Sequence, residues 1–142
     1  MQDNHNNIRV ARCISPLTQT NADTAIVGEI VDHAGADSVE YIIAYGAITD
    51  TNVTFTTLLE DGDDAALSDN AAVADANLLG TEVGATPLFS DDNKQFKLGY
   101  TGTKRYSRLT ITPSGNNSGD VPVSAVAVLG GLRTSPQTTQ KT

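Results

Sequence analysis

The chain has 142 residues, of which 39% are hydrophobic and 18% are charged, and its net charge is −8. This length suits one domain with its own core, and the composition is neither that of a disordered chain nor that of a membrane protein. The negative charge argues against nucleic acid as a partner, because binding to the phosphate backbone depends on Lys and Arg.

No export or membrane signal is visible. The first eight residues are polar, and the longest apolar run, Val123 to Leu132, is far shorter than the roughly 20 residues that span a bilayer. The single cysteine, Cys13, has no partner for an internal disulfide. We therefore expect a protein made in the cytoplasm that does not bind a membrane.

Short runs rich in β-branched residues, separated by turn residues, dominate the chain and predict strands. Gly28 is a candidate bulge in the second of them. Residues 65–79 are ambiguous, because they fit either a short helix or a long loop with a small edge strand at 71–74. The predicted strands span residues 8–14, 24–31, 38–48, 53–59, 95–100, 104–112 and 121–129.

Turn residues predict how some of these strands are connected. Residues 49–52 (TDTN) predict a hairpin between the third and fourth strands, and residues 113–119 (PSGNNSG) predict an exposed hairpin loop before the last one. The last strand is nearly continuous in Val and Ala, which is typical of a strand buried on both faces.

Seven or more short strands with frequent turns favour an all-β fold, a β-sandwich or jelly roll. We expect one such domain over residues 8–130. Residues 1–7 are predicted to form an extended N-terminal arm, and residues 131–142 an extended C-terminal tail.

Charge is divided unevenly along the chain. Residues 13–93 contain no Lys or Arg but hold fifteen of the seventeen acidic residues. Such a division fits a surface that binds a partner of complementary charge. It fits equally well basic and acidic strands that lie side by side and neutralise each other.

The strand at residues 104–112 concentrates positive charge and has two different faces. Leu109 and Ile111 predict that the face they share with Arg105 and Ser107 turns toward the core, with Arg105 at the rim beside an acidic neighbour. The opposite face would present Lys104, Tyr106 and Arg108, with the Tyr106 ring along the Arg108 stem. We predict that Lys104, Tyr106, Arg108 and Arg133 contact a partner.

The sequence contains no catalytic, metal or cofactor signature. The nucleophile motif G-x-S-x-G is absent, and His33 beside Asp32 reads as a solvated turn, since zinc needs three or four ligands. Asp61, Asp63 and Asp64 lack the spacing of an EF-hand, which leaves only a weak surface cation open there. We expect no enzyme activity, no cofactor and no structural metal.

Residues 98–129 carry a resemblance to a known group of proteins. The run Gly99-Tyr100-x-Gly102-Thr103-Lys104-Arg105-Tyr106, then Arg108-Leu109, and finally Ser124-Ala125-Val126-Ala127-Val128-Leu129 resemble the C-terminal half of small structural proteins of tailed bacteriophages and prophages. The resemblance implies a capsid cement, or decoration, protein whose β-sandwich body sits on the outer surface of the virion.

The same resemblance implies the partners. They would be the major capsid protein and further copies of the chain, as a homo-oligomer (a dimer or trimer). Two alternatives stay open: a neck or tail structural protein, and a carbohydrate-binding or host-attachment module, since RYSRL (105–109) is also similar to a strand of galactose-binding jelly rolls. Without Trp, the aromatic platforms for a sugar would have to come from Tyr41, Tyr45, Tyr100 or Tyr106.

Overall fold

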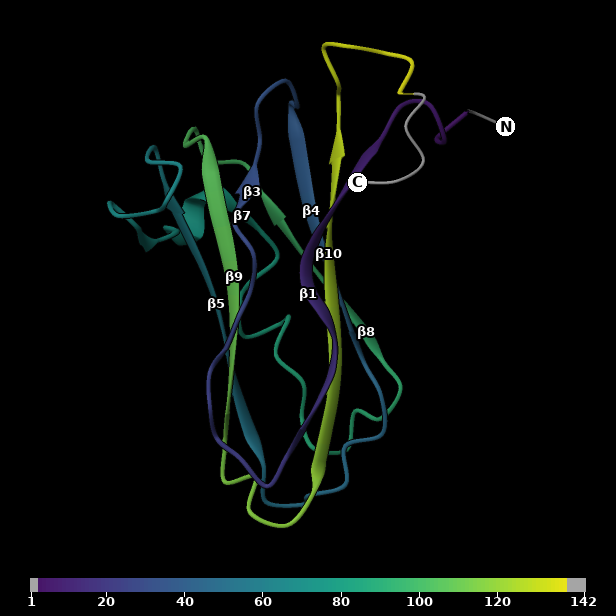
Figure 1. Cartoon of the computed structure of the whole chain (residues 1–142), viewed down its shortest axis with the longest axis vertical. Helices are drawn as coiled ribbons and strands as arrows, with labels where there is room; N and C mark the ends of the chain where they lie inside the picture. The colour runs from purple at the N-terminus through teal and green to yellow at the C-terminus, as the bar shows by residue number, and fades with distance from the viewer. Residues whose placement is uncertain (1–2, 138–142) are drawn as a thin grey trace.

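Two antiparallel sheets pack face to face in the computed structural model, which describes residues 3–137 (Figure 1). The first sheet has the order β1 (Arg9–Thr20), β10 (Asp120–Gly130), β4 (Ser38–Tyr45), β8 (Gln95–Tyr100) and β7 (Leu78–Leu79). The second has the order β2 (Ile26–Val27), β9 (Tyr106–Ser114), β5 (Thr54–Gly62) and β6 (Ala71–Ala72), and β3 (Val31–Asp32) also pairs with β9. The predicted all-β sandwich of jelly-roll type is confirmed.

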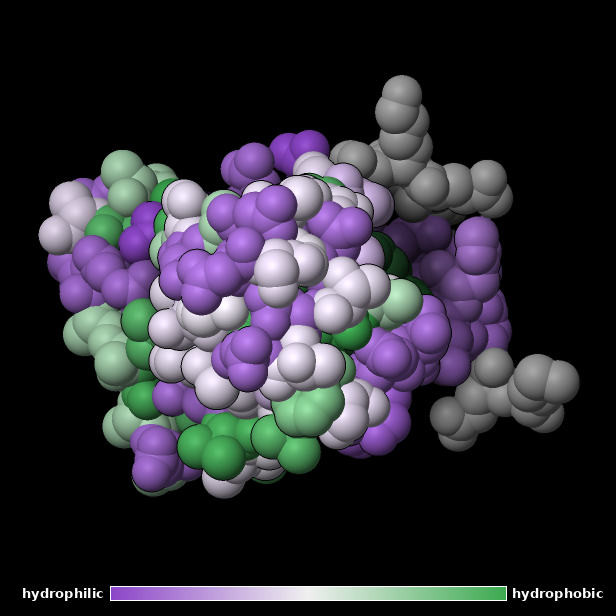
Figure 2. Space-filling view, turned by 90° about the horizontal axis from the view of Figure 1, so that it is seen from below, coloured by the Kyte–Doolittle hydropathy of each residue, from purple (hydrophilic) through white to green (hydrophobic). Residues whose placement is uncertain are grey.

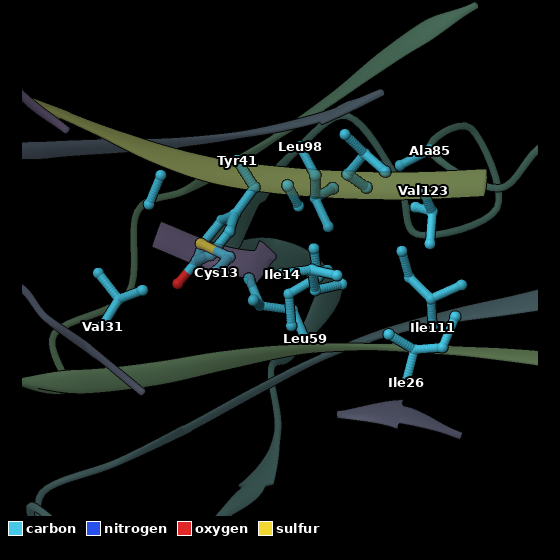
Figure 3. Close-up of a cluster of buried hydrophobic side chains, with 14 of the residues drawn as sticks. Cys13, Ile14, Ile26, Val31, Tyr41, Leu59, Ala85, Leu98, Ile111 and Val123 are labelled. Carbon is cyan, nitrogen blue, oxygen red and sulfur yellow. The ribbon is translucent and has the colours of Figure 1, made fainter. Parts of the chain in front are cut away.

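Alternation along the strands forms the core between the sheets. In β9, Ser107, Leu109 and Ile111 are buried while the residues between them are half-buried, as the sequence predicts. Leu109 lies opposite Leu59 of β5, and neither side chain is exposed. Figure 3 shows Leu59, Ile111 and Ile26 of the second sheet facing Tyr41, Leu98 and Val123 of the first.

The last strand, β10, is not buried on both faces as predicted. Val121, Val123, Ala125, Ala127 and Leu129 point into the core, whereas Val126 on the other face is 36% exposed. The strand is central in its sheet, between β1 and β4, and the residues on its outer face are half-buried or, at Val126, exposed. The apolar residues on the outer face of β10 fit a strand because Val favours strands whether or not its side chain is buried.

Both predicted hairpins are wrong, because each connection crosses from one sheet to the other. β4 pairs with β10 and β8, while β5 pairs with β9 and β6. Likewise, β9 and β10 belong to different sheets. Turn residues predict that the chain reverses, but the partner of each strand is decided by packing across the sandwich.

Two buried polar residues hold these crossing loops together. Asp50 accepts hydrogen bonds from the backbone N–H groups of Asn117 and Ser118, both at 2.9 Å. Asn116, which is 1% exposed, donates from its side chain to the carbonyl oxygens of Gln19 and Ala22. The loop at 113–119 is therefore anchored rather than fully exposed. Figure 2 views this end of the sandwich and shows hydrophobic residues (green) beside larger polar and neutral areas.

Gly28 separates two short strands instead of forming a bulge in a single one. Its N–H donates to the Leu109 carbonyl oxygen at 2.9 Å, and a Cβ at this position would come within 2.6 Å of the same oxygen. A side chain would thus push the chain off β9, so this close approach needs glycine.

The ambiguous segment forms a loop with an edge strand, β6, followed by a single 3₁₀ turn, η1 (Asp75–Asn77). Within residues 3–137, no helix has the length and apolar character needed to cross a membrane. The N-terminal arm and the C-terminal tail meet, because the N–H of Gln137 donates to the Asn6 carbonyl oxygen at 2.8 Å. The predicted tail residues 138–142 and arm residues 1–2 lie outside the described part of the chain.

Candidate functional site

A groove of about 500 Å³ lies at the end of the sandwich where β10 ends and β9 begins, the upper end in Figure 1. One wall is the turn between β3 and β4 (33–38), and the other is the loop between β8 and β9 (101–105). Arg133, from the segment after β10, completes the lining. We call this feature the basic groove.

Backbone hydrogen bonds set the shape of the basic groove. The N–H of Asp37 donates to the Gly130 carbonyl at 3.0 Å, and the N–H of Arg133 donates to the Gly35 carbonyl at 2.9 Å. The N–H of His33 donates to the Arg105 carbonyl at 2.9 Å, which joins the two walls. Because these bonds are between backbone groups, the walls keep their spacing whatever their side chains bind.

Three cations line the basic groove, and each has an acidic neighbour. Lys104 Nζ lies 2.6 Å from Asp63, and Arg105 lies 2.9 Å from Asp32. These contacts raise the pKa values of Lys104 and Arg105, and the hydrogen bond from Arg105 lowers the pKa of Asp32. Arg133 is held less closely, with Nε 4.0 Å from Asp37.

The floor of the basic groove contains a buried polar chain. His33 is 8% exposed; its Nε2 lies 2.5 Å from Ser107 Oγ, which also contacts the Tyr41 hydroxyl. The His33 ring packs on Tyr100 with 5.0 Å between ring centroids. Burial lowers the pKa of His33, so the neutral ring predominates at pH 7. A hydrogen bond to the Lys104 backbone favours the tautomer with its proton on Nδ1, and in that tautomer Nε2 accepts a hydrogen bond from Ser107.

His33 was expected in a solvated turn, and that expectation is wrong. The residue follows β3, and its side chain turns inward because Ser107 and Tyr41 supply polar partners beneath the groove. Among residues 3–137 there is no group of three or more His, Cys, Asp or Glu that could hold a metal.

The predicted contact residues fall into two places. Lys104 and Arg133 line the basic groove, whereas Tyr106 and Arg108 lie on the outer face of the second sheet. Lys104 precedes β9 rather than sharing its strand face. Arg105, not Arg108, lies over the Tyr106 ring, at 5.0 Å from the guanidinium carbon to the ring centroid. Arg108 pairs instead with Glu60, directly opposite on β5, at 3.0 Å.

The uneven charge along the chain is largely explained by internal pairing. In each of six ion pairs, the acid lies within residues 13–93 and the cation lies outside that window. The second interpretation of the charge pattern, basic and acidic strands that lie side by side, holds for Arg108 of β9 and Glu60 of β5, while the other pairs involve residues in loops. The pairs are Arg12–Glu29, Lys94–Asp91, Lys104–Asp63, Arg105–Asp32, Arg108–Glu60 and Arg133–Asp37.

The acidic residues at the end of β5 and just after it make contacts within the chain. Asp61 accepts a hydrogen bond from the Tyr100 hydroxyl at 2.7 Å, and Asp63 pairs with Lys104. Asp64 binds the backbone N–H of Ala66 at 2.8 Å. Cys13 is buried, and burial raises the pKa of its thiol to about 12, so it is no nucleophile near neutral pH.

The tyrosines offer no open platform for a sugar ring. Tyr41, Tyr45 and Tyr100 are 0%, 3% and 4% exposed. The remaining one, Tyr106, is half-buried beneath Arg105. Sugar-binding sites commonly depend on an exposed aromatic face, and the described residues do not present one on these side chains.

Sequence reasoning missed Arg105, His33 and Tyr100 as parts of one site. Gly102 stands two residues before Lys104 and Arg105, a signal of a turn that could have separated these two residues from the strand. The sequence around His33 gave no sign of burial, because its hydrogen-bond partner Ser107 is 74 residues away in the chain.

Gly102→Ala should disturb the basic groove from within. A Cβ at residue 102 would lie 2.4 Å from the Tyr100 ring, so the ring must move. This movement would disturb two hydrogen bonds of the Tyr100 hydroxyl, which donates to Asp61 and accepts from the Lys104 N–H. We expect a loss of about 1–3 kcal/mol in the free energy of unfolding, measured in urea. An Ala that left both the stability and the Tyr100 ring signals in NMR spectra unchanged would contradict this packing.

Comparisons with known proteins agree on architecture only. No family model and no curated protein matches the chain. A Clostridium thermocellum xylanase 10B, solved as CBM22-1 and GH10 modules with xylohexaose, is 11% identical with a TM-score of 0.49; the match covers 93% of this chain but only 26% of the xylanase. A xylan-binding module, CBM15, is 12% identical over 94% of this chain and 96% of its own, with a TM-score of 0.42.

A Bacillus endospore appendage, described as a disulfide-linked pilus, is 15% identical with 89% of each chain covered and a TM-score of 0.41. Identities and TM-scores of this order carry no information about what the chain binds. The fold is established by the two sheets of the structure itself, and proteins that share a fold can have many different functions.

Proposed function

We propose that this chain is a non-enzymatic structural protein of a bacteriophage particle, a decoration protein that binds the outer surface of the major capsid lattice. One observation carries the proposal. The run that resembles phage structural proteins, Gly99–Tyr106, supplies one wall of the basic groove through residues 100–105. Gly99 and Tyr100 are buried, so folding accounts for them, whereas residues 101–105 are exposed or half-buried and line the groove, where a shared sequence fits contact with a partner.

The end of the sandwich that holds the groove suits contact with a lattice. The N-terminal arm and the C-terminal tail meet at this end, where Ser135 Oγ also donates to Asn6 at 3.2 Å (Figure 1). A decoration protein binds through many copies, so modest contacts add up by multivalency. A symmetric homo-oligomer, a dimer or trimer, would present several grooves to one lattice axis.

The experiment that tests this function is the composition of purified particles. We expect quantitative mass spectrometry to find the chain at a copy number comparable with that of the major capsid protein. A few copies per particle would instead place it at the neck or tail, and absence from particles would overturn the proposal.

The carbohydrate-binding alternative has less support, because the tyrosine rings are buried or covered by Arg105. A glycan array discriminates between the two functions. Specific glycan binding that is lost on Tyr106→Ala, in a chain that is absent from particles, would favour the alternative.

A further inference from the structure

We propose that the basic groove binds carboxylates of an acidic, extended segment of a partner protein, with Arg133 as the principal contact. The identity of that partner, a capsid protein, rests on the proposed function. The chemistry of the contact does not, because it follows from the groove's own residues.

The first step is the sign of the charge. The groove lining contains Lys104, Arg105 and Arg133 against a single carboxylate, Asp37. Cations therefore outnumber carboxylates in the lining of a chain whose net charge is −8, with Asp63 and Asp32 placed just outside the lining as partners of Lys104 and Arg105. Three cations gathered around a concave site attract an anionic ligand to one place.

The second step is that these cations are available. The acids that pair with Lys104 and Arg105, Asp63 and Asp32, are outside the lining of the groove. All four side chains are at least 44% exposed, and ion pairs at such a surface contribute little to stability. A ligand carboxylate can therefore share the cations at little cost.

Arg133 is the most available of the three. Its side chain is 78% exposed, and its distance of 4.0 Å from Asp37 is too long for a hydrogen bond. Its backbone is nevertheless fixed, because the Arg133 N–H donates to Gly35. A guanidinium on a fixed backbone, with its donors free, is suited to bidentate binding of a carboxylate.

The third step favours a protein segment over an acidic polysaccharide. The walls facing each other are built from small residues, Ala34 to Ala36 on one side and Thr101 to Thr103 on the other. Such walls leave room for an extended main chain. The aromatic ring in the lining, Tyr100, is 4% exposed and cannot stack on a sugar.

The test uses the full chain, with hexaglutamate as the probe and hexaglutamine as its uncharged counterpart. Three variants each change one charge. Arg133→Gln removes the principal contact, Asp37→Asn removes the competing carboxylate, and Lys97→Gln removes an exposed cation on β8 that is not in the groove lining. Binding is followed by NMR amide shifts, which also report that each variant is folded.

We expect hexaglutamate to shift the amides of Gly35, Gly102 and Arg133, and hexaglutamine to shift none of them. Arg133→Gln should weaken binding roughly fivefold, as for the loss of one surface ion pair. Asp37→Asn should tighten binding to a similar degree, and Lys97→Gln should leave it unchanged. Raising the salt concentration should weaken binding of the wild-type chain.

Equal weakening by Arg133→Gln and Lys97→Gln would overturn the proposal, because it would show attraction to net charge rather than to the groove. Tighter binding of trigalacturonate than of hexaglutamate would overturn the choice of a protein segment. Since the probe contains no capsid protein, this experiment can succeed or fail independently of the copy number in particles.

Discussion

Replacing Leu109 by Ala is expected to lower the free energy of unfolding by about 3 kcal/mol. Leu109 is fully buried in β9, opposite Leu59, which is fully buried as well. The carbonyl of Leu109 also receives the N–H of Gly28, so the backbone is held on both sides and cannot move into the space that a shorter side chain leaves. Urea unfolding measures the change.

The matched control is the next residue along the same strand. Thr110 lies on the outer face of β9 and is half-buried, so Thr110→Ala should cost about 0.5 kcal/mol. The two substitutions therefore compare the inner and outer faces of one strand. Equal losses would contradict the placement of Leu109 in the centre of the core.

Alternation within single strands was predictable, because it depends on neighbours two residues apart. The inward face of β9, with Leu109 and Ile111, follows directly from period two. The same period makes Val121, Val123 and Leu129 inward residues of β10. What alternation does not report is how much covers the opposite face, which is why Val126 was expected to be buried.

Connections between strands were less predictable, because they depend on contacts between residues far apart. Asp50 and Asn117 come from different crossing loops and are 67 residues apart, yet their hydrogen bond ties both loops to one end of the sandwich. Each loop by itself has the composition of a hairpin turn. A local signal could not distinguish a reversal within a sheet from a crossing between sheets.

In the candidate site, too, local features were predictable and contacts between distant residues were not. Lys104 and Arg133 were predicted as contacts from charge, and both line the basic groove. That they belong to one groove could not be read from the sequence, because Arg133 is placed by its bond to Gly35, almost a hundred residues earlier. The pairing of Arg108 with Glu60 was equally invisible until β5 and β9 were found to be neighbours.

The polar chain under the groove should make the protein less stable in mild acid. With its proton on Nδ1, neutral His33 accepts a hydrogen bond from Ser107, and Ser107 can then accept one from the Tyr41 hydroxyl. A protonated Nε2 must donate instead, so Ser107 would have to turn its proton toward Tyr41. The hydroxyl proton of Tyr41, which is 0% exposed, would then lose its acceptor.

The charges around His33 act in both directions without removing this effect. Asp32 and Asp61 favour the protonated ring, as does a hydrogen bond to the backbone of Lys104, while Arg9 disfavours it. Burial is the largest influence and lowers the pKa of His33. Hydrogen bonds lower the pKa values of carboxylates such as Asp32 and Asp50, which moves their titration further from neutral pH and away from that of His33.

The sign of the pH dependence follows from the lowered pKa. Above about pH 6.5, the ordinary value for histidine, His33 is neutral in both the folded and the unfolded chain, and its contribution to stability is fully present. As the pH falls from there toward the folded-state pKa, the unfolded chain binds the extra proton and the free energy of unfolding decreases. One proton gives a slope of at most about 1.4 kcal/mol per pH unit.

The chain supplies its own control for this prediction, because its two histidines differ in burial. His33→Gln should flatten the decrease in the free energy of unfolding between about pH 7 and about pH 5, whatever it does to stability at neutral pH. His5→Gln, in the exposed N-terminal arm, should leave the slope as in the wild type. Urea unfolding across this range measures all three chains. A wild-type slope that survives in His33→Gln would show that the proton is bound elsewhere, and that the hydrogen bond between Ser107 and His33 does not hold the groove floor in its neutral form.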